Sequence, residues 1–67
     1  MVSYENLWRV MKEKNVKKID LHREANINDM TIAKLTKNEF VTLRTLYRIG
    51  RFLNCSISDM VSFDYDI

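Results

Sequence analysis

The chain has 67 residues, of which 46% are hydrophobic and 30% charged, a balance that excludes an intrinsically disordered chain and suits one small domain. One Gly and no Pro are too few for many tight turns between strands, so we expect an all-α fold. The single Cys excludes an internal disulfide and a multi-cysteine zinc site. All eleven Lys and Arg but only six of the nine acidic residues lie in the first 54 residues, which gives this part a net charge of +5. The remaining three acidic residues are Asp in the C-terminal tail. This charge distribution suits either a polyanionic partner or an ordinary solvated surface.

The sequence shows no targeting or membrane signal. No basic segment followed by a long apolar run stands at the N-terminus, and no apolar stretch approaches the roughly 20 residues that span a bilayer. The free thiol of Cys55 suits a reducing compartment. We therefore expect a cytoplasmic protein without membrane contact, in which no room is left for a ligand-sensing or catalytic domain.

The first helix is predicted over about Tyr4 to Lys14. Ser3 is its expected N-cap, and Glu5 favours the positive end of the helix dipole. The apolar residues follow the i, i+3, i+4, i+7 spacing of one buried face: Tyr4, Leu7, Trp8 and Met11.

Two short helices joined by a tight turn are predicted between Lys18 and Asn38, one over roughly 18–25 and one over roughly 29–36. Asn26 stands where the turn needs a left-handed residue, and Asn28 stands where the next helix needs a cap. Five apolar residues are expected to lock the two helices together: Leu21, Ala25, Ile27, Ile32 and Leu35. The outward arc of the second helix of the pair is left to Asp29, Met30, Ala33, Lys34 and Lys37.

A fourth helix is predicted to start after Thr42, a good N-cap, and to end near Leu53. Its expected apolar stripe is Leu43, Leu46, Ile49, Gly50 and Leu53. A glycine inside such a stripe weakens the helix, and its usual reason is the close approach of another backbone. Tyr47 and Phe52 lie off the stripe, and they either form a surface for a partner or pack under the C-terminal tail.

The end of the chain changes its period. A short fifth helical turn is predicted after Ser58, and from Val61 to Ile67 apolar and polar residues then alternate strictly, as in a half-buried strand. A lone strand has no partner in a helical bundle, so it either pairs with the same strand of a second copy or forms an extended tail that lies over the body. The expected dimer interface is Tyr47, Phe52, Val61, Phe63, Tyr65 and Ile67.

From Lys18 to Asn38 the sequence resembles the helix-turn-helix of the phage-repressor and Cro-like (XRE-type) DNA-binding domains, in particular their compact, single-domain members. The residues that carry the resemblance are Leu21, Ala25, Ile27, Asn28, Thr31, Ile32, Leu35 and Asn38. The flanking helices fit as well, so the resemblance reaches to about Val61. It implies a five-helix, lambda-repressor-like domain over residues 1–67 that places the second motif helix in the major groove of double-stranded DNA.

The resemblance also implies roles for individual residues. The side chains expected at base edges are Asp29, Met30, Ala33 and Lys34. Among these, Lys34 suits guanine O6 or N7, Met30 a thymine methyl and Asp29 cytosine N4. The residues expected at phosphates are Lys18, Asn28, Thr31, Lys37, Asn38, Thr42 and Arg44.

The sequence therefore predicts a DNA-binding transcriptional regulator, most simply a repressor that occludes its site as a dimer on a near-palindrome. The alternative is a small helical module, antitoxin-like or adaptor-like, that uses the same fold to hold a protein. We expect no enzyme, because no titratable residues converge and Cys55 has no neighbouring base. We also expect no cofactor, small-molecule effector or metal, since His22 does not converge with Asp20 and Glu24 on one helix face.

Overall fold

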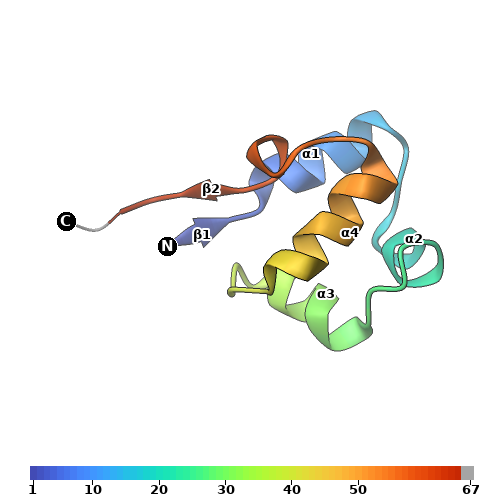
Figure 1. Ribbon diagram of the computed structural model, residues 1–67, viewed down its shortest axis with the longest axis horizontal. Helices are drawn as coiled ribbons and strands as arrows, with labels where there is room; N and C mark the ends of the chain where they lie inside the picture. The colour runs from blue at the N-terminus through green and yellow to red at the C-terminus, as the bar shows by residue number, and fades with distance from the viewer. Residues whose placement is uncertain (66–67) are drawn as a thin grey trace.

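The computed structural model describes residues 1–65, which form four α-helices, one 3₁₀ turn and a two-stranded ribbon (Figure 1). The elements in chain order are β1 (Val2–Ser3), α1 (Glu5–Glu13), α2 (Lys18–Arg23), α3 (Asp29–Thr36), α4 (Leu43–Leu53), the 3₁₀ turn η1 (Ile57–Asp59) and β2 (Ser62–Phe63). The predicted interface residue Ile67 lies outside the described residues.

The expected fifth helix is wrong for the described part of the chain, where a single 3₁₀ turn takes its place. The Asp59 carboxylate accepts the backbone N–H of Ser56 (3.0 Å) and closes this turn at its start. The chain then leaves the helical path because Met60, 0% exposed, and Val61, 7% exposed, are drawn into the core.

Three predicted helix ends also differ, the first helix ending at Glu13 rather than Lys14. The first helix begins at Glu5 rather than Tyr4; Ser3 is not its N-cap residue, although Ser3 Oγ accepts the backbone N–H of Glu5 (3.3 Å). The second helix ends at Arg23, two residues before Ala25. The boundaries of α3 and α4 agree with the prediction, because Asn28 and Thr42 both accept a backbone N–H three residues on, as N-caps do.

Asparagine takes the place of glycine where the helices end. Asn15, Asn26, Asn38 and Asn54 have φ of 57°, 58°, 56° and 57°, and each lies one to three residues after the last residue of a helix. Asparagine adopts this left-handed conformation more readily than other residues with a Cβ. A chain with one Gly can therefore still make four sharp helix ends.

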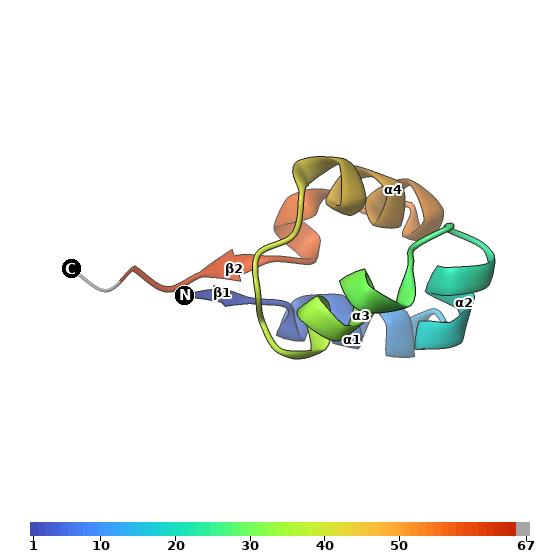
Figure 2. The ribbon, with the colours of Figure 1, turned by 90° about the horizontal axis from the view of Figure 1, so that it is seen from below.

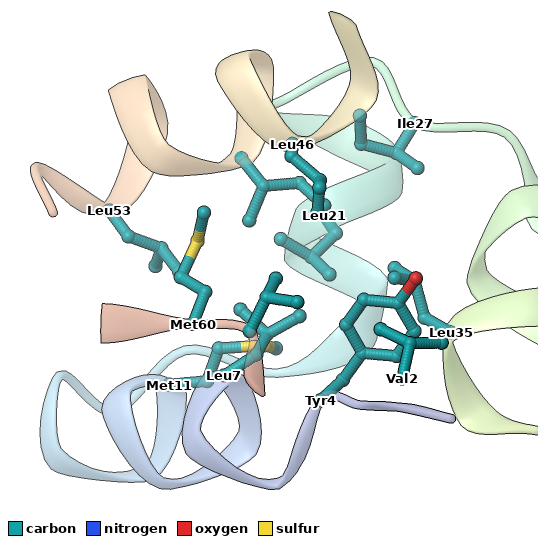
Figure 3. Packing of buried hydrophobic residues seen from close by; sticks show 12 residues of the cluster. Val2, Tyr4, Leu7, Met11, Leu21, Ile27, Leu35, Leu46, Leu53 and Met60 are labelled. Carbon is teal, nitrogen blue, oxygen red and sulfur yellow. The ribbon is translucent and has the colours of Figure 1, made fainter. Parts of the chain in front are cut away.

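The core takes side chains from all four helices and from both ends of the chain (Figure 3). Its buried residues are Val2, Tyr4, Leu7, Met11, Leu21, Ile27, Leu35, Leu46, Ile49, Leu53, Met60 and Val61. Leu43 was expected in this stripe, but it is 69% exposed because it is the first residue of α4 and precedes the buried face.

Gly50 confirms the expected close approach of a second backbone. A Cβ at this position would lie 2.8 Å from the carbonyl oxygen of Cys55, and the Cys55 N–H donates to the Gly50 carbonyl (2.9 Å). The chain therefore folds back tightly against α4 and runs toward β2.

The C-terminal strand pairs within the same chain, an arrangement that neither predicted alternative included. β1 and β2 pair antiparallel with Val2 opposite Phe63 and Ser3 opposite Ser62. The ribbon projects from the helical body at one end (Figures 1 and 2), so the tail does not lie over the body as the second alternative had it. Phe63 and Tyr65 are accordingly 56% and 75% exposed.

In the part of the chain that the structure describes, the longest helix has 11 residues, and none has the length and apolar character that crossing a membrane requires.

Candidate nucleic-acid interface

Helix α3 turns one face to the core and the other to solvent. Leu35 is 0% exposed and Ile32 is half-buried, and together they fill the inner face. The five residues expected on the outward arc are all exposed: Asp29, Met30, Ala33, Lys34 and Lys37. Since no other element of the described chain covers this arc, α3 presents a row of side chains with one carboxylate and two ammonium groups.

Local hydrogen bonds fix the start of α3. The Thr31 backbone N–H donates to Asn28 Oδ1 (2.8 Å), which confirms Asn28 as the cap. The ring of His22 on α2 spans the turn, with Nδ1 3.0 Å from the Ile27 carbonyl oxygen and 3.5 Å from Asp29 Oδ1. The imidazole of His22 thus joins α2 to Ile27 in the turn and to the first residue of α3.

Lys18 is exposed at the surface but makes two contacts within the chain. Its Nζ donates to Thr36 Oγ1 (3.0 Å) and lies 4.7 Å from the centroid of the Trp8 ring. A cation over an aromatic face is attracted by the ring quadrupole, so Lys18 connects α1, α2 and the end of α3. This arrangement competes with the phosphate contact expected of Lys18, which stays a prediction.

Tyr4 holds the loop between α3 and α4. Its hydroxyl donates to the Glu39 carbonyl oxygen (2.7 Å), and its backbone N–H donates to Asn38 Oδ1 (3.2 Å). Burial raises the pKa of the Tyr4 phenol, and a hydrogen bond with the backbone of Val41 offsets part of that rise. The Asn38 carboxamide oxygen, from a residue expected at a phosphate, is therefore engaged with the protein backbone.

The fixed loop and α3 enclose a shallow depression of about 240 Å³ on the surface. Its lining residues are Thr31, Lys34, Phe40, Val41, Thr42 and Thr45. The structure thus brings together three of the predicted DNA-binding residues: Thr31 and Lys34 from α3, and Thr42 from the start of α4. The prediction did not include the other three lining residues, Phe40, Val41 and Thr45. For Phe40 the available signal was an aromatic residue in a polar loop, outside every helical stripe.

Other predicted residues lie elsewhere. Arg44 lines a separate groove of about 610 Å³ between α4 and the α2–α3 turn, together with Tyr47 and Phe52. Tyr47 is 62% exposed and Phe52 is half-buried against the core.

The residues expected at a dimer interface do not form one patch. Val61 is buried within the chain, at 7% exposed. Phe63 and Tyr65 lie on the projecting ribbon, with ring centroids 6.2 Å apart, whereas Tyr47 and Phe52 lie on α4. Among residues 1–65, no group of three or more His, Cys, Asp or Glu side chains converges as a metal site would require.

The capped, outward helix and the short turn before it are the defining parts of a helix-turn-helix domain. Residues 6–66 match the model of the Cro/C1-type HTH DNA-binding domain, so the chain belongs to this family of DNA-binding domains, which are not enzymes. Among solved structures, the crystal structure of the transcriptional regulator VanUg superposes with a TM-score of 0.87; it is 38% identical in sequence, and the match covers 91% of this chain and 81% of that one. None of the curated proteins matches the chain significantly.

Proposed function

We propose that this protein is a sequence-specific transcriptional regulator that binds double-stranded DNA through the major groove, represses by occluding its site, and acts as a dimer. The observation that carries the proposal is the outward face of α3, whose side chains are exposed while its start is fixed by Asn28 and the α2–α3 turn. An α-helix with its side chains is about 10–12 Å across and fits the major groove, which is about 12 Å wide, so residues on the outward face of α3 reach base edges. The similarity to the regulator VanUg supports the same role.

In this proposal residues 1–67 act as one DNA-binding unit whose side chains have two kinds of task. Asp29, Met30, Ala33 and Lys34 read base edges. The residues that hold phosphates are Lys18, Asn28, Thr31, Lys37, Asn38, Thr42 and Arg44. Phosphate contacts position the protein without reading sequence, whereas each good base contact contributes about 1–3 kcal/mol of discrimination.

A dimer fits a near-palindromic site, since two copies then place two α3 helices about 34 Å apart on one side of the duplex. The exposed aromatic side chains are its candidate contacts: Tyr47 on α4, and Phe63 and Tyr65 on the ribbon. The same aromatic residues favour the second candidate function, a module that binds another protein.

Selection of bound sites from a random DNA pool at two salt concentrations tests the proposal. We expect a two-fold symmetric site whose affinity falls steeply with salt, because phosphate binding releases counterions. A protein-binding module instead predicts no enriched site, little salt dependence, and a loss of partner binding on substitution of Tyr47 or Phe63.

Two lysine variants separate reading from positioning. Lys34→Ala should abolish the sequence preference at one base pair. Lys37→Ala should weaken binding to all DNA sequences about equally and lower the slope of log affinity against log salt concentration by roughly one. Lys14→Ala is the charge-matched control, because Lys14 follows α1 and lies beside Asn54 and Cys55, away from α3. If Lys37→Ala changed the preferred sequence and Lys34→Ala did not, the assignment of the reading face would be wrong.

A further inference from the structure

Phe40 is a large apolar side chain that the fold keeps at the surface. It lies in the loop between α3 and α4 and is 71% exposed. Single exposed apolar residues are common, so exposure alone says little. The surroundings of Phe40 are more informative.

The backbone on the N-terminal side of Phe40 is fixed from two sides. The Glu39 N–H donates to the Lys34 carbonyl (2.9 Å), and the Glu39 carbonyl accepts the hydroxyl of Tyr4, a residue 1% exposed. Asn38, just before, has the left-handed φ of 56° that ends α3 sharply. The ring of Phe40 is therefore presented by a backbone that is already ordered, and binding through it needs little further loss of backbone freedom.

Phe40 also shares its depression with the residue proposed to read bases. Lys34 lines that depression from α3, and Thr42 and Thr45 line it from the start of α4. Leu43, which is 69% exposed and equally apolar, lies three residues further along but does not line it. Phe40 therefore differs from Leu43 in its position beside Lys34, not in its apolar character.

The edges of bases in the major groove are hydrogen-bond donors and acceptors, with one apolar group, the C5 methyl of thymine. We propose that Phe40 is a specificity-determining residue whose ring packs on a thymine C5 methyl in the base step next to the one that Lys34 contacts. This inference rests on the proposed function, since it adds a base-contacting residue from outside the helix-turn-helix. The α3–α4 loop then contributes to sequence choice in addition to holding phosphates.

Replacing thymine by deoxyuridine, one position at a time, in the site recovered by selection removes only the methyl group. In the unchanged protein, one such replacement at the flank of the half-site should weaken binding about fourfold, the value of one buried methyl group of about 0.8 kcal/mol. Phe40→Ala should weaken binding to the thymine-containing site and should lose its response to that one replacement. Sensitivity at any other thymine, such as one that Met30 touches, should persist.

Leu43→Ala is the matched control and should leave affinity and the deoxyuridine response unchanged. Thermal unfolding of each variant separates binding from folding, and Phe40→Leu keeps an apolar side chain should Phe40→Ala be less stable. If Phe40→Ala binds as tightly as the unchanged protein, or keeps the same response at every thymine, the inference is overturned. The proposed function survives that result as long as Lys34→Ala still loses its base preference; no enriched site at all overturns the function itself.

Discussion

The α2–α3 unit and the β1–β2 ribbon are both short, but the residues that hydrogen-bond within each differ greatly in their separation along the sequence. In the α2–α3 unit the defining hydrogen bonds join residues three to five apart, as between Asn28 and Thr31 or His22 and Ile27. In the ribbon, Val2 pairs with Phe63, at the other end of the chain. The unit that presents the reading helix is therefore specified locally, whereas the ribbon exists only once the rest of the chain has folded.

A ribbon with two residues in each strand has no stability of its own in water. The body supports it, because Val2 and Val61 are buried and the Leu7 N–H donates to the Met60 carbonyl (3.1 Å). Tyr4 extends this support to the α3–α4 loop, so the N-terminal segment affects the proposed DNA-binding surface without lying on it. Four substitutions test how separate the two regions are.

Gly50→Ala should have the largest effect on stability. An added Cβ would meet the Cys55 carbonyl at 2.8 Å, so the segment that leads to β2 must shift. We expect a loss of about 2 kcal/mol in the free energy of unfolding, measured with urea. Helix propensity alone predicts a gain of about 1 kcal/mol, so a more stable variant would show that the backbones are not in close approach.

Tyr4→Phe should cost about 1 kcal/mol, because it removes the hydroxyl that donates to Glu39 in a well-packed site. Burial raises the pKa of this phenol above its ordinary 10.0, so the folded state favours the neutral form. The contribution of the neutral phenol to the free energy of unfolding is therefore fully present below pH 10.0 and decreases as the pH rises above 10.0. Urea unfolding of both proteins from pH 8 to about pH 11 should show a smaller decline for Tyr4→Phe; equal declines would exclude this contribution of Tyr4.

Asn28→Ala should also destabilise, by about 1 kcal/mol, through the lost cap of α3. Asn28→Ser keeps a capping oxygen and should restore most of the loss. Thermal unfolding measures both variants. Should serine fail to rescue, the contribution of Asn28 would lie elsewhere than in the hydrogen bond to Thr31.

Phe63→Ala should have the smallest effect, within about 0.5 kcal/mol, because the side chain is 56% exposed on the ribbon. Val61→Ala, two residues earlier but 7% exposed, is the control and should cost on the order of 1–2 kcal/mol. Sedimentation at several concentrations adds a second measurement. Weaker self-association of Phe63→Ala at unchanged stability would place the ribbon in the dimer contact, and unchanged association would move that contact to α4.

The site was only partly predictable from sequence. The outward arc of α3 follows from helical periodicity, so its five exposed residues were expected correctly. The place of Phe40 and the intramolecular contacts of Lys18 were missed, because both depend on partners that are distant in sequence: Tyr4 for the loop around Phe40, and Trp8 and Thr36 for Lys18. The pairing of β2 was missed for the same reason, since nothing near Phe63 in the sequence indicates Val2.

By itself the sequence determined the helical class, the boundaries of α3 and α4, the left-handed turn at Asn26 and the need for space at Gly50. Each of these depends on a residue's own backbone preference or on neighbours within about one helical turn, where spacing and chemistry act directly. Only the tertiary structure decided that the chain ends pair as a ribbon, that Lys18 is engaged by Trp8, and that Phe40 stands beside Lys34. These features depend on which distant surfaces meet when the core forms, and the pattern of one segment does not specify which distant segment it will contact.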